Sequence, residues 1–204
     1  MRPAPALCTL ALLCAAPLAW TFRADLKAPA RYTLLIQVEN PVPARTLDEI
    51  RTELNSVMRM TGWDFDLLLF TDMAPNQEFR DLVVVRFKGE CRMAALPVRR
   101  QDGPLAFAHT SDGEVLPFMD VFCDRIRGSV RAAMWGDQYR RADQIMGRAL
   151  ARIIAHELYH IIGKTSVHSP SGIANHSLSG EQLVSDKLDF TPEAMEAITI
   201  GGGG

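Results

Sequence analysis

The sequence HELYH at residues 156–160 restricts the possible folds of this chain more than any other feature. It lies within residues 140–162, where apolar side chains recur with helical period and no proline intervenes. His156 and His160 are four residues apart, so a helix projects both from one face, with Glu157 beside them. The sequence therefore predicts a long helix that carries a metal site.

The surroundings of this segment indicate the chemistry of that site. Two imidazoles at this spacing bind one Zn²⁺, which lowers the pKa of a bound water and polarises a scissile carbonyl. Glu157 is then the general base that moves the proton. The alternative is a chance match on a surface helix. It is disfavoured because the flanking residues are mostly apolar, and unpaired His and Glu side chains are costly to bury.

A catalytic zinc has three protein ligands and an open fourth position, so a third ligand is required. Downstream, the side chains that could supply it are His168, His176, Glu181 and Asp186. Spacing alone does not choose among them.

The motif extends to HExxHxxG, with a histidine a few residues later, and so resembles the metzincin clan of zinc proteases. In that clan the glycine, here Gly163, turns the chain and brings in a third histidine. The resemblance implies His156, His160 and His168 as ligands, although the usual spacing falls on Ser166. Residues 164–167 must therefore bulge, and His176 or a gluzincin-like Glu181 are the alternatives.

A second resemblance follows at residues 171–174, which are similar to the clan's turn beneath the zinc. Ala174 stands where the clan has a methionine. Either the turn is present without that methionine, which is not a metal ligand in the clan, or the match is accidental.

Hydrophobic periodicity predicts an α+β fold: a twisted mixed sheet, two long helices and a small, mostly irregular C-terminal part. The expected strands are 32–38, 64–70, 81–88, 105–109 and 116–126. The first helix is expected to begin at Thr46, with Glu49 completing a capping box, and a short helix at Thr191. By analogy with the clan, residues 104–110 or the neighbouring extended segment form the edge strand that holds substrate, and an ordinary hairpin is the alternative.

The N-terminus predicts export. Residues 1–19 resemble a secretory signal peptide, because one arginine precedes a short uncharged apolar run that is too short for a membrane span. The zincin-like domain is then expected at 20–200, followed by a flexible glycine tail at 201–204. Cleavage leaves Cys91 and Cys123, which predict one disulfide in an oxidising compartment; two buried thiols are the alternative.

The net charge of −2 offers no general attraction for nucleic acid. A loose basic stretch around Trp135 is interpreted as solvated surface. Tyr159 is expected to pack rather than bind metal, and His109 to be structural. The members of the basic stretch are Arg127, Arg131, Arg140 and Arg141.

Together these features predict a monomeric, secreted or periplasmic zinc metalloendopeptidase with peptide or protein substrates, no nucleic-acid partner and no stable membrane span. Two alternatives stay open. One is a non-catalytic zinc-binding envelope protein with a degenerate protease fold. The other is a zinc amidase of cell-wall peptides, since the same chemistry cleaves any amide.

Overall fold

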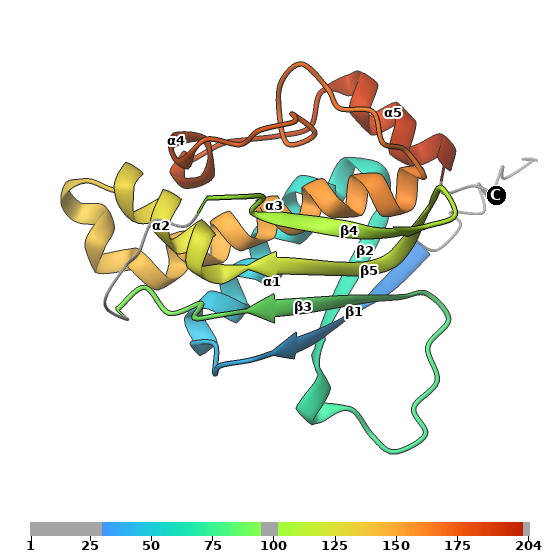
Figure 1. The fold of residues 1–204 in the computed structure, drawn as a ribbon, viewed down its shortest axis with the longest axis horizontal. Coiled ribbons are helices and arrows are strands. Elements are labelled where there is room, and N and C mark those ends of the chain that lie inside the picture. Colours follow the sequence, from blue (N-terminus) through green and yellow to red (C-terminus); the bar gives the residue numbers. More distant parts are fainter. Residues whose placement is uncertain (1–29, 95–101, 202–204) are drawn as a thin grey trace, which may run out of the picture.

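A computed structural model describes residues 30–94 and 102–201, and its α+β architecture confirms the predicted fold class (Figure 1). In chain order the elements are β1 Ala30–Val38, α1 Ala44–Met58, η1 Arg59–Thr61, β2 Trp63–Leu69, η2 Phe70–Asp72, β3 Leu82–Lys88, β4 Ala106–Ser111, β5 Glu114–Phe122, α2 Cys123–Ala133, η3 Gly136–Arg141, α3 Ala142–Gly163, α4 Gly180–Val184 and α5 Pro192–Gly201.

The five strands form one mixed sheet in the order β2-β1-β3-β5-β4. β2, β1, β3 and β5 are parallel, whereas β4 pairs antiparallel with β5. The turn at Asp112 and Gly113, both with positive φ, joins β4 and β5. β4 is therefore an edge strand, as predicted, and it lies beside α3 (Figure 1).

One face of the sheet packs on α1 and α3. Val83, Val85 and Phe87 alternate along β3 and are fully buried, which is the period-two pattern of a strand with one face in the core. α1 approaches α3 closely at Gly147, where an added Cβ would meet the carbonyl oxygen of Thr46 at 2.5 Å. This packing fixes the helix that carries the predicted metal site.

The capping box predicted at Thr46 is wrong. α1 begins at Ala44, directly after Pro43, which makes no side-chain cap. Thr46 is fully buried instead, and its hydroxyl donates to the carbonyl oxygen of Asp143 on α3. Thr46 therefore bonds to α3 rather than capping α1, the role that the local sequence had predicted for it.

A second correction concerns residues 116–126, which were predicted to be extended throughout. β5 ends at Phe122 and α2 begins at the next residue. Ile126, Arg127 and Val130 form the buried stripe of this helix. Arg127 is thus not solvated surface as predicted, because it is 4% exposed and pairs with Asp124 at 2.7 Å.

The predicted disulfide is present between Cys91 and Cys123. It ties the segment after β3 to the first residue of α2, across 32 residues of sequence. A loop of that size constrains the unfolded chain by about 3.7 kcal/mol.

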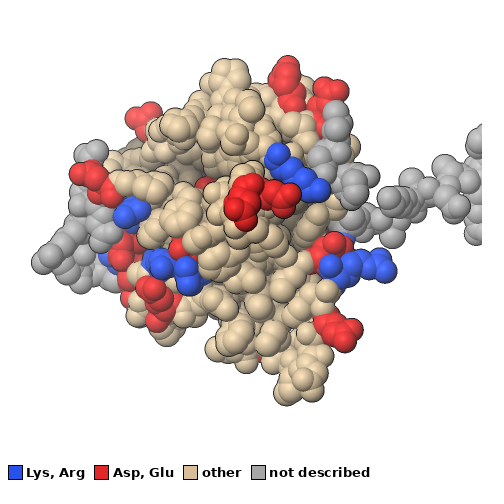
Figure 2. All heavy atoms as spheres, turned by 45° about the vertical axis from the view of Figure 1, so that its right-hand side comes forward, with Lys and Arg blue, Asp and Glu red and all other residues tan. Residues whose placement is uncertain are grey.

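The C-terminal part is mostly irregular, as predicted, but it contains α4 as well as α5. Gly201 belongs to α5 rather than to a tail, and the predicted signal segment 1–19 lies outside the described residues. None of the described helices has the length and apolarity needed to span a membrane. On the face drawn in Figure 2, acidic and basic side chains are interspersed.

Candidate metal centre

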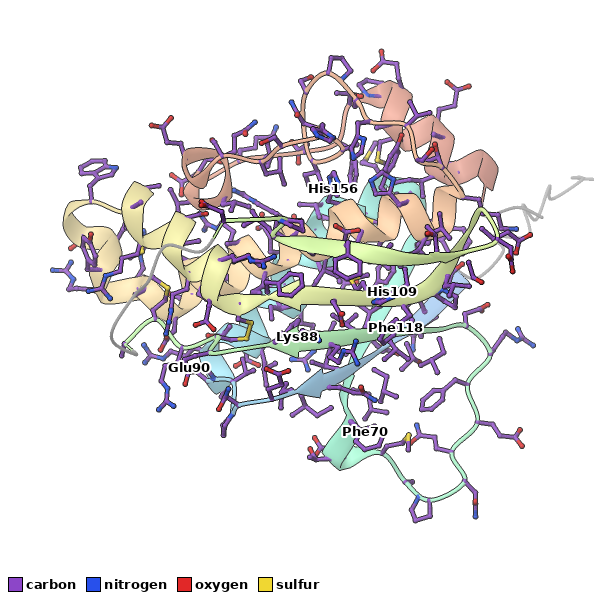
Figure 3. The ribbon with its side chains drawn as sticks, in the orientation of Figure 1. Phe70, Lys88, Glu90, His109, Phe118 and His156 are labelled. Atoms are coloured by element: carbon purple, nitrogen blue, oxygen red, sulfur yellow. A yellow bond between two sulfur atoms is a disulfide. The ribbon has the colours of Figure 1, made fainter. Side chains whose placement is uncertain are left out.

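His156 and His160 lie one turn apart on α3, and their Nε2 atoms are 3.2 Å from each other. His168, in the loop after the helix, places its Nε2 3.2 Å from that of His160. The ligand atoms of all three lie within 4.8 Å of one another. The structure thus brings together the three histidines predicted as ligands, between β4 and the C-terminal segment, where Figure 3 labels His156.

The chain reverses at Lys164 to bring in His168. Lys164 has a left-handed conformation, with φ 46°, and its N–H caps α3 by donating to the carbonyl of His160. Gly163, predicted to make this turn, is the last helical residue instead. A non-glycine residue at positive φ carries backbone strain of about 1–3 kcal/mol, which the surrounding contacts must hold in place.

Two backbone carbonyls orient the helical histidines. Nδ1 of His156 lies 2.8 Å from the carbonyl oxygen of Ile173, and Nδ1 of His160 lies 2.7 Å from that of Thr165. A carbonyl oxygen only accepts, so each Nδ1 carries the hydrogen and donates it. The neutral rings therefore present unprotonated Nε2 lone pairs, which is the second-shell arrangement typical of metal-ligating histidines.

The Nε2 atoms of His156 and His160 have no hydrogen to share when the rings are neutral, so their lone pairs face each other at 3.2 Å. That arrangement is repulsive unless a cation lies between the nitrogens. Tetrahedral coordination with bonds of 2.0–2.1 Å separates ligand nitrogens by about 3.3–3.4 Å. Two of the three pairs already have nearly this separation, and all three ligand atoms lie within 4.8 Å of one another, so the three histidines could hold one metal ion.

The histidines are also kept in the neutral form that binds metals. The pKa of His156 is lowered to about 4, chiefly by burial and also by the neighbouring histidines, against the opposing effect of the Ile173 carbonyl. Burial also lowers the pKa of His160 and of His168. Protons therefore compete weakly for these nitrogens at neutral pH.

Glu157 lies beside the histidines and is 6% exposed. Its Oε2 accepts a hydrogen bond of 2.7 Å from the backbone N–H of Ala108 on β4. Burial raises the pKa of Glu157 to about 7, although this hydrogen bond acts in the opposite direction. With His156 it borders a cavity of about 180 Å³, so the carboxyl group has access to a bound molecule.

Residues 171–174 form a turn against the histidines. Gly172 has φ 72°, and an added Cβ there would meet the carbonyl oxygen of Asp189 at 2.5 Å, so a side chain does not fit. Ile173 donates its N–H to that same oxygen and offers its own carbonyl to His156. Ala174 is fully buried. Neither Thr165 nor Ile173 was predicted to act at the site, because every residue has a carbonyl group and sequence carries no signal for this role.

Of the alternative third ligands, only His176 lies near the cluster. Its ring is edge-on to that of His168, with centroids 4.8 Å apart, and it borders the same cavity. It is not part of the group of three ligand atoms found among the described residues, nor are Glu181 and Asp186. Asp186 pairs with Arg148 instead, at 3.1 Å.

His109 and Tyr159 have the positions expected of non-ligands. His109 is on β4 and lies 3.3 Å from Asp120, and Figure 3 shows it apart from His156. Burial alone would raise the pKa of Asp120, but Arg86, which binds it through two nitrogens, holds that pKa below its usual value. Tyr159 is 4% exposed in the core.

No model of a known protein family matches the chain, and no curated protein sequence matches it. The geometry of the described residues therefore carries the functional inference.

Proposed function

We propose that this chain is an exported zinc metalloendopeptidase in which His156, His160 and His168 bind the metal and Glu157 is the general base. The observation that carries the proposal is the convergence of three imidazole nitrogens beside a buried carboxyl group that borders a cavity. Carboxyl groups are rarely buried without a partner or a chemical role.

Zinc is the metal that this ligand set suits best. All three ligands are neutral imidazole nitrogens, and three protein ligands leave a tetrahedral ion one open position, as in catalytic zinc sites. Bound zinc supplies Lewis acidity, which lowers the pKa of water and polarises a carbonyl.

Glu157 is placed to accept and return a proton. Its Oε2 is occupied by the Ala108 N–H, while Oε1 receives no hydrogen bond from the described residues. A pKa of about 7 lets the group gain or lose a proton near neutral pH, which is what general acid–base catalysis requires.

The orientation of the edge strand β4 supports the proposal that the substrate is a peptide. The carbonyl of Leu105 accepts from the N–H of Phe122, so that residue bonds toward β5. The Ala108 N–H points the other way, toward α3, and the unpaired edge of β4 therefore borders Glu157. An extended peptide can pair its main chain with such an edge and align a scissile bond across the site.

The adjoining cavity supports the proposal that the enzyme selects its substrates by one of their side chains. At about 180 Å³ it admits one side chain, and Leu105, Ile153 and Leu178 form part of its wall. We therefore propose a preference for an apolar residue next to the cleaved bond.

Export is supported by the disulfide, since such bonds persist in oxidising compartments and are rare in the cytosol.

Proteolysis of an unfolded protein substrate by the purified zinc-loaded chain tests the proposal. Cleavage is expected to disappear with a chelator and with Glu157→Gln, which preserves the shape of the side chain. Cleavage that survives both treatments excludes the mechanism.

The alternatives have their own signatures. Stoichiometric zinc without cleavage of a broad peptide library identifies a non-catalytic zinc protein. Release of amide products from peptidoglycan fragments, but not from proteins, identifies a cell-wall amidase.

A further inference from the structure

A second hollow lies at the other end of α3 from the metal centre. It has a volume of about 320 Å³ and is formed by the start of α1, the segment after β3, η3 and the first turn of α3. At 1.5 Å per residue, Ala142 is about 20 Å from His156 along the helix, so the two sites are separate. In Figure 1 this end is where the yellow α2 leads into the orange α3.

Arginines dominate this hollow. Arg131, Arg140 and Arg141 of the basic stretch meet Arg45 from α1, which is distant in sequence. Asp143 is the one acidic residue of the lining, and its carboxylate already accepts a hydrogen bond from the backbone N–H of Met93. We refer to this site, defined by Arg45, Arg131, Arg140, Arg141 and Asp143, as the arginine pocket.

The positive charge of the arginine pocket is poorly compensated within the protein. Arg140 pairs with Asp137, but both side chains are largely exposed, and such pairs contribute little. Arg131 donates only to the backbone carbonyl of Met93, at 3.4 Å. Within residues 30–94 and 102–201, the side chains of Arg45 and Arg141 have neither a hydrogen bond nor an ion pair.

The end of α3 adds to the same potential. Ala142, Asp143 and Gln144 begin this 22-residue helix and line the arginine pocket, and Arg141 before them provides no side-chain cap. The N-terminal end of a long helix carries partial positive charge that favours anions. Four arginines and a helix end thus border one hollow that is open to solvent.

We propose that the arginine pocket binds a phosphate group. Several guanidinium forks match the oxygens of a phosphate group through paired hydrogen bonds, and the second charge of a phosphomonoester would neutralise more of the positive charge than a single carboxylate would. The volume is at the small end for ligand sites, enough for a phosphomonoester or one lipid headgroup. The proposal is independent of the metal centre.

Calorimetric titration with inorganic phosphate and with glycerol 3-phosphate tests the pocket for a soluble ligand. Sedimentation with vesicles of phosphatidylglycerol, against phosphatidylcholine alone, tests it for a headgroup. The variant is Arg45→Gln with Arg141→Gln. Its matched control is Arg59→Gln with Arg80→Gln, which removes the same charge from two exposed positions elsewhere.

The pocket variant is expected to bind phosphate, or the anionic vesicles, about 100-fold more weakly, because two charge-assisted contacts are lost. The control is expected to stay within about threefold, since it alters only long-range charge. Far-UV circular dichroism spectra unchanged in both variants show that each is folded. The proposal is overturned if the wild type binds neither phosphate compound nor anionic vesicles, or if both variants weaken binding equally.

Discussion

α3 carries two groups of buried polar side chains, which differ in whether their polar atoms find hydrogen-bond partners within the protein. Arg152 is fully buried, and its Nε donates to Glu53 at 2.7 Å. Its Nη1 donates to the carbonyls of Gln182 and Ser185, at 2.7 and 2.9 Å, so that the C-terminal segment is tied to the helix. One turn further along, the histidine Nε2 atoms face one another and the Oε1 of Glu157 receives no bond from the described residues.

This difference distinguishes polar groups that are buried to stabilise the fold from polar groups that are buried to bind a ligand. A buried charge whose partners belong to the chain stabilises one packing arrangement, and removing it leaves those partners unsatisfied. Buried lone pairs that face each other stabilise nothing until a cation arrives from solution. The metal centre is therefore expected to govern activity and metal binding, and Arg152 to govern folding.

The largest expected effect is on turnover in Glu157→Gln. The rate constant for peptide cleavage should fall about 10²–10⁴-fold, the usual contribution of a general base. At pH 4.5, where Glu157 in the folded protein is uncharged as glutamine is, the free energy of unfolding should change by less than about 1 kcal/mol, because glutamine still accepts from the Ala108 N–H. Steady-state kinetics and urea denaturation measure the two quantities. A large loss of stability with little loss of rate would reverse the comparison.

Arg152→Met should give the opposite result. We expect the free energy of unfolding to fall by about 3–5 kcal/mol, because Glu53 and the α4 carbonyls lose their buried partner. Chemical denaturation of the metal-free protein measures this. The substitution Arg59→Met, at an exposed position, is the control and should change stability by less than about 0.5 kcal/mol. Equal effects at the two positions would show that the hydrogen bonds of Arg152 do not stabilise the packing of the C-terminal segment on α3.

Histidine substitutions test which imidazoles in the metal centre bind the metal. His168→Ala should weaken zinc binding by more than about 100-fold, since even outer-shell changes cost 10–100-fold. His176→Ala removes a ring that lies beside the cluster but outside it, and should change the affinity by less than about threefold. Competition with a chromophoric chelator measures both constants. The reverse order would make His176 the third ligand.

The smallest effect is a dependence of stability on pH in the metal-free protein. Glu157 has a raised pKa, so its contribution is present below pH 4.5 and is lost as pH rises through about 7. His156 has a lowered pKa, so its contribution is present above pH 6.5 and is lost as pH falls through about 4. The two oppose each other and partly cancel in the wild type.

Variants separate these contributions. Relative to the wild type, Glu157→Gln should lose up to about 3 kcal/mol on acidification from pH 7 to 4.5, and His156→Asn should gain a similar amount from pH 6.5 to 4. Urea denaturation across this pH range measures both differences. Parallel curves for all three proteins would contradict the assigned environments of these groups.

Much of the fold and the centre of the site could be predicted from the sequence, because they depend on the spacing of residues within a single helix or strand. Helical spacing identified α3, and runs of apolar, β-rich residues identified the strands of the sheet. The prediction of residues 123–126 as extended was wrong, although Cys123, Ile126 and Val130 have helical spacing, because the first turn of α2 runs directly on from β5. Arg127 was misplaced for a related reason, since its partner Asp124 is on that same helix and the buried face of the helix includes Arg127.

By itself the sequence determined that His156 and His160 share one face with Glu157 beside them, because 3.6 residues per turn is a local property of the backbone. Only the tertiary structure decided which carbonyls fix the imidazoles and that the edge of β4 bonds Glu157. It also decided that arginines from two distant segments meet at the start of α3. The physical reason is that carbonyls, edge N–H groups and surface arginines occur throughout the chain, and packing alone selects those that converge.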